Sequence, residues 1–503
     1  MPDQPNILLI TSDQQHWSTL GAVNPTLWTP SLDRLAAEGT LHTRAYCPNP
    51  TCTPSRASMI TGLWPSRHGA WSLGTKLPED VPTVGARLQE AGYRTSLIGK
   101  AHFQPLAATP GHPSIEAYPT LHDDTFWRGF HGPFYGFEHV ELTRNHTDEG
   151  HAGQHYGQWL EARGCADWRR YFRPPAGTKD DSVHRWAIPE KYHYNAWIAE
   201  RTAAGMDRAR VEGRPFFLWA SFFDPHPPYL APEPWDTLYD WRRLQAPEID
   251  PGEHDVNPRH HRLTQEEAPD FSAWEEQGGH RVLGFHSHRR DRERRQRDMA
   301  VYYGMVSLLD KYVGRILHHL EVSGLADNTL VVFTSDHGHL FGQHGLVAKG
   351  PFHYEDLLRV PLITRFPGRI PARRRDPRLQ TLVDLPATFL ACAGLEVPAT
   401  MSARSQWATW ADPEAPGRDC VLVENRHQPT TVHLNTLVTA RYKLTVYRQG
   451  GVGELFDLQE DPGERRNLWA EPAAQEVKRQ LLERMVRAEM ENQPLPMPRV
   501  SIA

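Results

Sequence analysis

The sequence predicts an α/β protein with a large mixed, mostly parallel sheet flanked by helices and a smaller C-terminal α+β domain with an antiparallel sheet. Short apolar runs that end in polar residues, at 6–13, 215–224 and 328–338, indicate buried strands. Segments with helical spacing lie between these runs. Near residue 410 the pattern changes to short, partly alternating runs. We therefore expect two domains, 1–409 and 410–503.

Composition excludes several classes of protein. A net charge of −6 argues against a nucleic-acid partner, which needs a clustered basic face. Five cysteines are few, odd in number and scattered, so a disulfide scaffold is excluded. No run has the length that crosses a membrane, and the first apolar run ends at Asp13, too early for a signal-peptide core. We expect a soluble, cytoplasmic chain without a membrane partner.

The chain up to about residue 210 alternates strands and helices. Residues 6–13 predict a strand, and residues 30–39 predict a surface helix with a capping serine and a closing glycine. A helix at 81–92, a strand at 93–99 and a helix at 194–210 follow. This alternation is typical of parallel βα units.

The second half continues this pattern and then departs from it. A strongly periodic helix is predicted at 299–320, a strand at 360–363 and a helix start at 384–390. The C-terminal part is predicted to hold strands at 420–424, 436–439 and 442–447, an amphipathic helix at 472–492, and a tail to Ala503 that reaches a partner subunit.

Two segments have poor periodicity. Residues 105–190 are rich in Pro, Gly, His and aromatic residues, and we expect loops and short helices that wall a substrate pocket. Their aromatic residues fit either a core or a subunit contact: Phe126, Trp127, Phe130, Phe134, Tyr135 and Phe137. Residues 235–298 are highly charged, and the alternating signs at 289–295 are typical of a solvated helical face. A lid or an oligomer arm is the alternative.

Residues 52–56, Cys-Thr-Pro-Ser-Arg, combine a thiol, a proline and a guanidinium. Proline predicts a turn at Cys52, and Ser55 is the expected N-cap of a helix through 57–60. A helix N-terminus and Arg56 would lower the pKa of the thiol and attract an anion. From these five residues alone, a nucleophile in an anion site and a structural cysteine beside a turn are equally favoured.

Polar residues follow each predicted strand, where open α/β sheets place their sites. Each also has an ordinary interpretation: a strand-end Asp caps a turn, a Lys lies on the surface, and a His between prolines belongs to a rigid turn. The residues concerned are Asp13, Gln14, Lys100, His102, His226, Asp336 and His337, together with Lys349 further on.

Together these segments resemble the type I sulfatases of the alkaline-phosphatase-like superfamily. Residues 52–69 contain C-x-P-S-R, then A-S-x-x-T-G and P-x-R-H-G. G-K-x-H at 99–102, H-x-P at 226–228, Asp-His-Gly at 336–338 and the lysine segment at 345–350 follow in family order. The resemblance spans nearly the whole chain apart from the two poorly periodic segments. It implies an alkaline-phosphatase-like fold and hydrolysis of sulfate monoesters.

The resemblance also implies a modification of Cys52. In this family the cysteine becomes formylglycine, and the maturation enzyme reads the Cys, Pro and Arg that stand here as Cys52, Pro54 and Arg56. The hydrated aldehyde is the nucleophile, and its second hydroxyl drives release of sulfate. Arg56 would stabilise the hydrate.

The remaining catalytic roles are carried over in the same way. Lys100 and Lys349 would hold the charge on the sulfate. His226, together with Lys349, would protonate the leaving oxygen, and His102 would take the proton of the second hydroxyl.

The implied metal ligands are Asp13, Gln14, Asp336 and His337, together with position 52. Most sulfatases have Asp-Asp and Asp-Asn here, so Gln14 and His337 are departures. An imidazole in an oxygen-rich set favours one Mn²⁺ or Ca²⁺ ion over Mg²⁺.

These departures resemble a branch with phosphonate monoester hydrolases and cytoplasmic arylsulfatases, so hydrolysis of phosphonate monoesters or phosphodiesters is the alternative. Lys100 and His102 favour sulfate, because the phosphonate branch has hydroxyl side chains there. A choline-sulfatase-like preference stays open. An intact Cys52 motif argues against a non-catalytic binding protein. The long C-terminal tail suggests a homo-oligomer, either a dimer or a tetramer.

Overall fold

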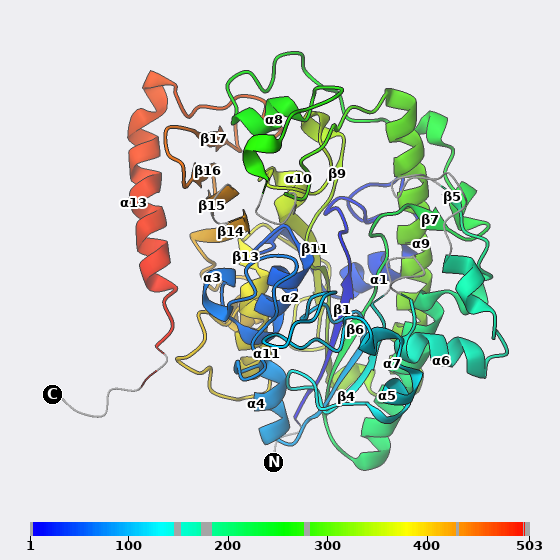
Figure 1. The fold of residues 1–503 in the computed structure, drawn as a ribbon. Coiled ribbons are helices and arrows are strands. Elements are labelled where there is room, and N and C mark those ends of the chain that lie inside the picture. The colour runs from blue at the N-terminus through cyan, green and yellow to red at the C-terminus, as the bar shows by residue number, and fades with distance from the viewer. Residues whose placement is uncertain are drawn as a thin grey trace, which may run out of the picture.

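The computed structural model describes residues 4–144, 152–172, 184–275, 282–428, 432–495 and 497. Within these residues the main sheet has nine strands in the order β12-β2-β11-β8-β1-β6-β3-β4, with β13 beside β2 (Figure 1). The strands β8, β1, β6, β3 and β4 are parallel, and β11 runs opposite to both of its neighbours. The predicted mixed, mostly parallel sheet is therefore confirmed. Its strands are β1 Asn6–Ser12, β2 Thr40–Tyr46, β3 Arg94–Gly99, β4 His139–Leu142, β6 Phe216–Ser221, β8 Thr329–Ser335, β11 Arg359–Arg365, β12 Arg374–Asp376 and β13 Gln380–Thr381.

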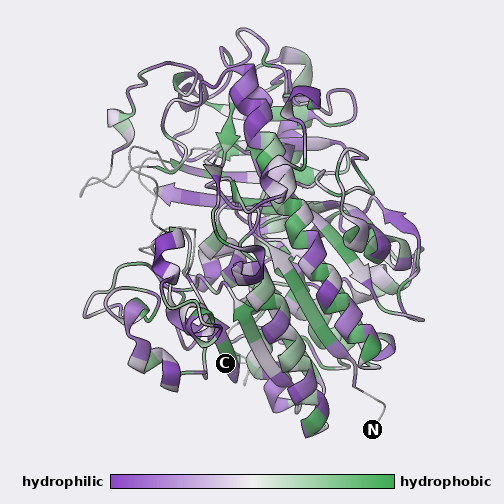
Figure 2. Cartoon of the chain, turned by 90° about the vertical axis from the view of Figure 1, so that its right-hand side faces the viewer, coloured by the Kyte–Doolittle hydropathy of each residue, from purple (hydrophilic) through white to green (hydrophobic). Residues whose placement is uncertain are grey.

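Helices cover both faces of this sheet (Figure 1). One layer is α1 Pro30–Glu38, α7 Tyr194–Glu212 and α9 Arg292–Val322; the other includes α2 Cys52–Thr61, α4 Val84–Glu90 and α11 Leu385–Cys392. In β1, Leu8 and Ile10 pack in the core with α7 and α9, whereas Ile7 and Leu9 pack in the core with α2 and α11. Figure 2 shows the apolar central strands behind helices with polar outer faces, as expected for strands buried on both sides.

The C-terminal part forms a separate antiparallel sheet, which confirms that prediction. Its strands are β14 Cys420–Gln428, β15 Val432–Thr439, β16 Tyr442–Tyr447 and β17 Gly453–Asp457, paired in that order. Helix α13 (Gln475–Glu491) lies along it and buries Leu481, Met485 and Ala488. The tail after residue 497 lies outside the described residues.

Short elements complete the chain. They are α3 Pro65–His68, α5 Asp124–Gly129, α6 Gln154–Ala162, α8 Arg259–Leu263, α10 Glu355–Leu358, α12 Trp407–Ala411, β5 His184–Arg185, β7 Leu230–Ala231, β9 Leu340–Phe341 and β10 Val347–Ala348.

The predicted start of α2 was wrong. The helix begins at Cys52, and Thr51 precedes it in an extended conformation. Pro54 falls in the first turn, where the backbone N–H groups have no partner within the helix, so its missing N–H costs nothing. Ser55 is not the N-cap; its hydroxyl instead donates to the carbonyl oxygen of Asp336 at 2.6 Å.

Helix α9 is longer than predicted because it begins within the charged run. The Asp291 carboxylate accepts a hydrogen bond from Arg294 N at 2.7 Å and caps the helix. The exposed residues of the first two turns agree with the solvated helical face that the alternating charges predicted.

The segment 105–190 contains a sheet strand that the sequence did not predict. Strand β4 pairs with β3, and its position there adds an edge to the main sheet. The aromatic residues pack into the core around α4 and α11, and four are buried: Trp127, Phe134, Tyr135 and Phe137. Of the two interpretations left open for them, the structure supports the core. Residues 145–151 and 173–183 of this segment lie outside the described residues.

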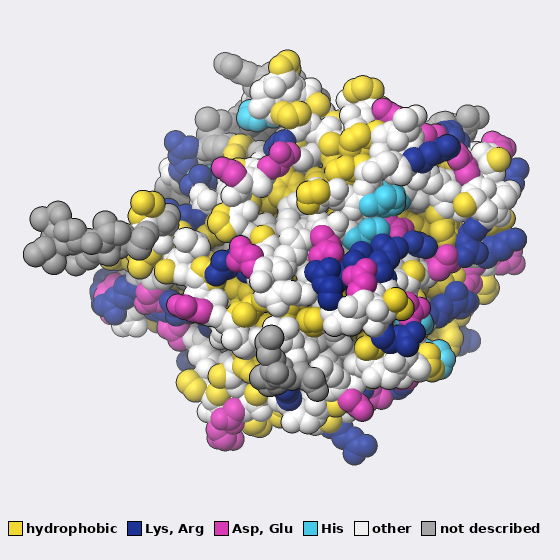
Figure 3. All heavy atoms as spheres, turned by 90° about the horizontal axis from the view of Figure 1, so that it is seen from below, with side chains coloured by type: hydrophobic (Ala, Val, Ile, Leu, Met, Phe, Trp, Pro, Cys, Tyr) yellow, Lys and Arg dark blue, Asp and Glu magenta, His cyan; other side chains and the backbone are white. Residues whose placement is uncertain are grey.

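The surface mixes charges of both signs. On the face in Figure 3, Lys and Arg side chains are interspersed with Asp and Glu. Among the described residues, no helix is both long and apolar enough to span a bilayer.

Candidate active site

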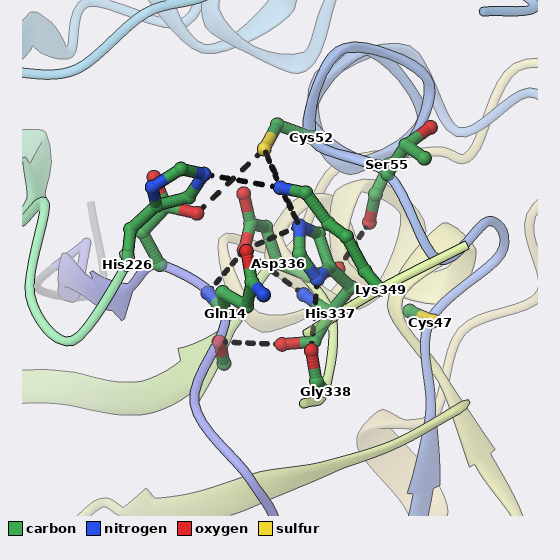
Figure 4. Close-up of polar contacts among 12 residues, drawn as sticks. Gln14, Cys47, Cys52, Ser55, His226, Asp336, His337, Gly338 and Lys349 are labelled. Atoms are coloured by element: carbon green, nitrogen blue, oxygen red, sulfur yellow. Dashed lines mark hydrogen bonds and ion pairs between the residues drawn. The ribbon is translucent and has the colours of Figure 1, made fainter. Parts of the chain in front are cut away.

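The site lies at the carboxyl ends of four adjacent parallel strands. Asp336 follows β8, Asp13 follows β1 and Lys100 follows β3, while β6 between them leads into the loop with His226. The N-terminus of α2 brings Cys52 to the same edge (Figure 4). Residues more than three hundred positions apart meet here because parallel strands end together.

Cys52 lies at the centre of the cluster. Its Sγ is 3.3 Å from His337 Nε2, 3.3 Å from Lys349 Nζ and 3.7 Å from Asp13 Oδ1. Lys349 Nζ is also 3.1 Å from His226 Nε2 (Figure 4). Cys52 is 1% exposed and Lys349 7%, so the charges act in a nearly water-free environment.

Four of these side chains form a group suited to a cation. Ligand atoms of Asp13, Cys52, Asp336 and His337 all lie within 4.8 Å of one another. The buried Oε1 of Gln14 has no hydrogen-bond partner among the described residues, although burial makes an unpaired amide oxygen costly. A missing partner of positive charge explains both observations, so this donor set fits a divalent metal ion.

Each carboxylate of the set also contacts a buried cation. Lys100 Nζ forms an ion pair with Asp13 Oδ2. Arg56 Nε donates to Asp336 Oδ2 at 2.8 Å, and its Nη1 donates to Ser221 Oγ at 2.7 Å and to the carbonyl oxygen of Lys100 at 3.0 Å. Burial acts to raise the pKa of Asp336, but Arg56, His337 and Lys100 together hold that pKa below its usual value.

The same charges act on the thiol. Burial acts to raise the pKa of Cys52, but Lys100, Lys349 and His337 together hold it well below its usual value. The site is therefore built to hold negative charge at position 52.

Two histidines face the thiol from opposite loops. Burial and the Arg144 charge hold the pKa of His102 well below its usual value, and His102 forms a hydrogen bond with Cys52. His226 follows β6, and its Nδ1 donates to the carbonyl oxygen of Pro227. Burial and Lys349 lower the pKa of His226, so both rings are neutral proton acceptors or donors.

The sulfatase family matches residues 5–395 of the chain. The chain belongs to the sulfatase family. The C-terminal region described as N-sulphoglucosamine sulphohydrolase, C-terminal, matches residues 342–491. Members of this family hydrolyse sulfuric esters, so at family level the protein is a sulfuric ester hydrolase.

Relatives and solved structures agree with this assignment over almost the full length. An arylsulfatase of Clostridium perfringens is 27% identical over 92% of this chain and 90% of its own. A choline-sulfatase of Rhizobium meliloti is 27% identical over 93% of this chain and 83% of its own. The structure of a phosphonate monoester hydrolase from Silicibacter pomeroyi superposes with a TM-score of 0.79 at 27% identity, covering 99% of this chain and 98% of that one. The alkaline-phosphatase-like fold is thereby confirmed.

The structure places every residue predicted for the sulfatase site in one cluster. It also shows supporting residues that the sequence did not identify. Glu116, from the poorly periodic segment, accepts hydrogen bonds from the backbone N–H groups of His102 at 2.9 Å, Phe103 at 3.0 Å and Gln104 at 2.9 Å. A single acid in a loop gives no signal in the sequence. His339 contacts Gln14, and its place two residues after the Asp336-His337 pair was the signal that could have identified it.

Proposed function

We propose that this sulfatase hydrolyses sulfate monoesters of the arylsulfatase type, with residue 52 as formylglycine and one divalent metal ion. The observation that carries the proposal is the convergence on Cys52 Sγ of a lysine, two histidines and a carboxylate-rich donor set. A sulfate monoester presents three anionic oxygens and one bridging oxygen that must be protonated on departure. This cluster offers cations for the former and imidazoles for the latter.

Asp13, Gln14, Asp336 and His337 would hold the metal, with position 52 completing the set. A bound divalent ion supplies Lewis acidity: it polarises a sulfate oxygen and favours ionisation of the nucleophilic hydroxyl. Mn²⁺ or Ca²⁺ suits three oxygen donors and one imidazole better than Mg²⁺.

Formylglycine at position 52, as its hydrate, supplies one hydroxyl for attack and a second for release of sulfate. Lys349, 3.3 Å from the Cys52 Sγ position, would bind the sulfate oxygens, and Lys100 would add charge from the side of Asp13. Arg56 holds α2 against Asp336 and so fixes the position of residue 52.

Proton transfer is assigned to the two histidines. The Pro227 carbonyl only accepts, so His226 Nδ1 carries a hydrogen and Nε2 accepts from Lys349 Nζ at 3.1 Å. The Lys349–His226 pair can therefore deliver a proton to the leaving oxygen. His102, kept neutral beside position 52, would accept the proton of the second hydroxyl.

Peptide mass spectrometry across Cys52 tests this proposal, on protein expressed with the maturation enzyme, together with hydrolysis of an aryl sulfate. We expect conversion of the thiol to the aldehyde, and activity that Cys52→Ala abolishes. Full activity in protein whose Cys52 is unmodified would overturn the formylglycine assignment.

Hydrolysis of phosphonate monoesters is the second candidate. The Silicibacter pomeroyi phosphonate monoester hydrolase matches over 99% of the chain, and the Gln14 and His337 departures point to the same branch. Lys100 and His102 favour sulfate. The ratio of kcat/KM for an aryl sulfate and an aryl phosphonate decides between them.

We also propose a formylglycine-generating enzyme as maturation partner, and a homo-oligomer. A reducing, cytoplasmic setting is supported by the five cysteines, which are buried and free. Size measurement in solution tests the oligomer, and localisation of the tagged full-length protein tests the compartment.

A further inference from the structure

Gln14 is held at every polar atom except one. Its backbone N donates to Asp336 Oδ1 at 3.0 Å, and its carbonyl oxygen accepts from the Tyr302 hydroxyl at 2.7 Å. Its amide Nε2 lies 2.9 Å from His339 Nδ1. Oε1 alone is buried without a partner among the described residues. The backbone has a φ of 60°, which an L-residue adopts only where the surroundings enforce it.

The ring of His339 cannot turn away from this contact. It is fully buried, lies on Tyr302 with ring centroids 4.8 Å apart and an interplanar angle of 23°, and meets Phe341 edge-on at 4.8 Å. On its far side, Nε2 lies 3.0 Å from the Tyr229 hydroxyl. Packing therefore fixes the position of Nδ1.

The two hydrogen bonds from Gln14 to His339 and from His339 to Tyr229 run in one direction. An amide NH₂ only donates, so His339 Nδ1 accepts from Gln14 and the ring hydrogen is on Nε2. That hydrogen is donated to the Tyr229 oxygen. The amide is thereby oriented with its NH₂ toward His339 and its oxygen away from it.

We propose that His339 and Tyr229 are positioning residues that orient the Gln14 amide so that Oε1 is presented to the metal ion. This inference rests on the proposed function, because it takes Gln14 as a ligand. The Gln14 amide can be held in this way because its NH₂ has a fixed acceptor in His339 Nδ1. Partners behind a ligand typically change metal affinity about 10- to 100-fold.

The test is a calorimetric titration of demetallated full-length protein with Mn²⁺ alone. His339→Phe keeps an aromatic ring in the stack and removes the acceptor. We expect it to weaken Mn²⁺ binding about 10- to 100-fold. His339→Asn places an oxygen near the Nδ1 position and should restore the affinity to within about threefold of wild type.

Two further variants keep the test decisive. His353→Phe replaces another buried histidine, which contacts Thr436 Oγ1 at 2.7 Å in the C-terminal sheet, and should leave Mn²⁺ affinity unchanged. Tyr229→Phe removes only the hydroxyl that accepts from His339, and it should weaken binding in the same direction if His339→Phe does not fold.

The outcomes separate this inference from the proposed function. Wild-type protein that binds neither Mn²⁺ nor Ca²⁺ would overturn the metal assignment, and this inference with it. If wild-type protein binds Mn²⁺ and the variants His339→Phe and Tyr229→Phe bind it with the same affinity, the positioning role alone is overturned. Equal weakening by His339→Phe and His339→Asn would also overturn it, because packing would then be the cause.

Discussion

The site has two halves that are held differently. We call the residues at the strand ends the strand half and the residues in the loops the loop half. Asp13, Asp336 and Lys100 stand one residue after buried parallel strands, so the sheet itself fixes their backbones. His102 and Lys349 stand in loops, where side chains from the poorly periodic segments hold the backbone N–H of His102 and that of Val347, two residues before Lys349. The strand half is held by fully buried ion pairs with the ligand carboxylates. In the loop half the backbone is held by hydrogen bonds to one neutral ring and to one carboxylate, and that carboxylate in turn pairs with buried Arg144 at 3.3 Å.

Mutations in the two halves should therefore have different effects on stability and on turnover. Breaking a buried ion pair leaves a charge without compensation, so a change in the strand half should damage folding and activity together. A change in the loop half should shift catalytic groups by small distances, and it should reduce turnover more than stability.

The largest effect is expected for Arg56→Ala. The substitution leaves Asp336 buried without its guanidinium, and we expect a loss of about 3–5 kcal/mol in the free energy of unfolding. Urea denaturation measures this loss. The matched control is Arg34→Ala, because Arg34 pairs with Glu321 at 2.8 Å near the surface and should contribute less than about 1 kcal/mol. Equal losses for the two variants would contradict the comparison.

Lys349→Ala tests the loop half directly. Removing a cation that contacts the position of the transferring group should lower kcat about 10²- to 10³-fold. Mn²⁺ affinity should stay close to wild type, because Lys349 is not among the proposed ligands. Steady-state kinetics measure the loss of kcat, and Mn²⁺ titration measures the affinity of the metal ligands. Lys478→Ala on α13 is the control. A loss of Mn²⁺ affinity as large as the loss of kcat would show that the halves are not separable.

Glu116→Gln should disturb the loop of His102 more gently. One oxygen of the carboxylate accepts from His102 N, and the other accepts from Phe103 N and Gln104 N. An amide NH₂ therefore faces at least one backbone N–H, and Arg144, which pairs with Glu116 at 3.3 Å, keeps at most a neutral acceptor. We expect a loss of about 1–3 kcal/mol in stability and a fall of about tenfold in kcat. Glu90→Gln, at an exposed pair with Arg87, is the control. Wild-type kcat in Glu116→Gln would refute the positioning of His102 by this carboxylate.

The same division explains what the sequence could predict. The buried strands were predicted from apolar runs with polar ends, and these runs also placed Asp13 and Asp336 at the edge of a parallel sheet. Their role as ligands came from the family resemblance, because a strand-end Asp alone also fits a turn cap. The start of α2 was misplaced because proline in a first turn resembles proline in a loop.

In the loop half, only the positions of His102, directly after a predicted strand, and of His226, after the strand at 215–224, pointed to the site. Lys349 was identified only through the family resemblance, because residue type alone favours the surface. Glu116 gave no usable pattern, because its partners are backbone N–H groups that only the folded chain brings near. His339 was missed although it stands two residues after the Asp336-His337 pair. Strand β4 was missed for a related reason: four residues are too few to show a period.

Acid should destabilise the loop half through His288. His288 Nδ1 accepts from Val347 N at 3.1 Å, just ahead of Lys349, and its Nε2 donates to Gly284 O at 2.8 Å. Burial lowers the pKa of His288 from 6.5 to about 3. The charged or titratable groups that add to this shift are His254, His286 and Arg290.

The unfolded chain therefore binds this proton first, and stability that is complete above pH 6.5 is lost as pH falls toward about 3. One such group contributes up to about 1.4 kcal/mol per pH unit in this window. His288→Gln accepts and donates without titrating, so its urea midpoint should fall less steeply between about pH 6 and pH 4 than that of wild type. His112→Gln, at an exposed position, should keep the wild-type slope. Identical slopes for all three proteins would contradict a lowered pKa of His288 in the folded chain, and the acid sensitivity predicted for the loop half with it.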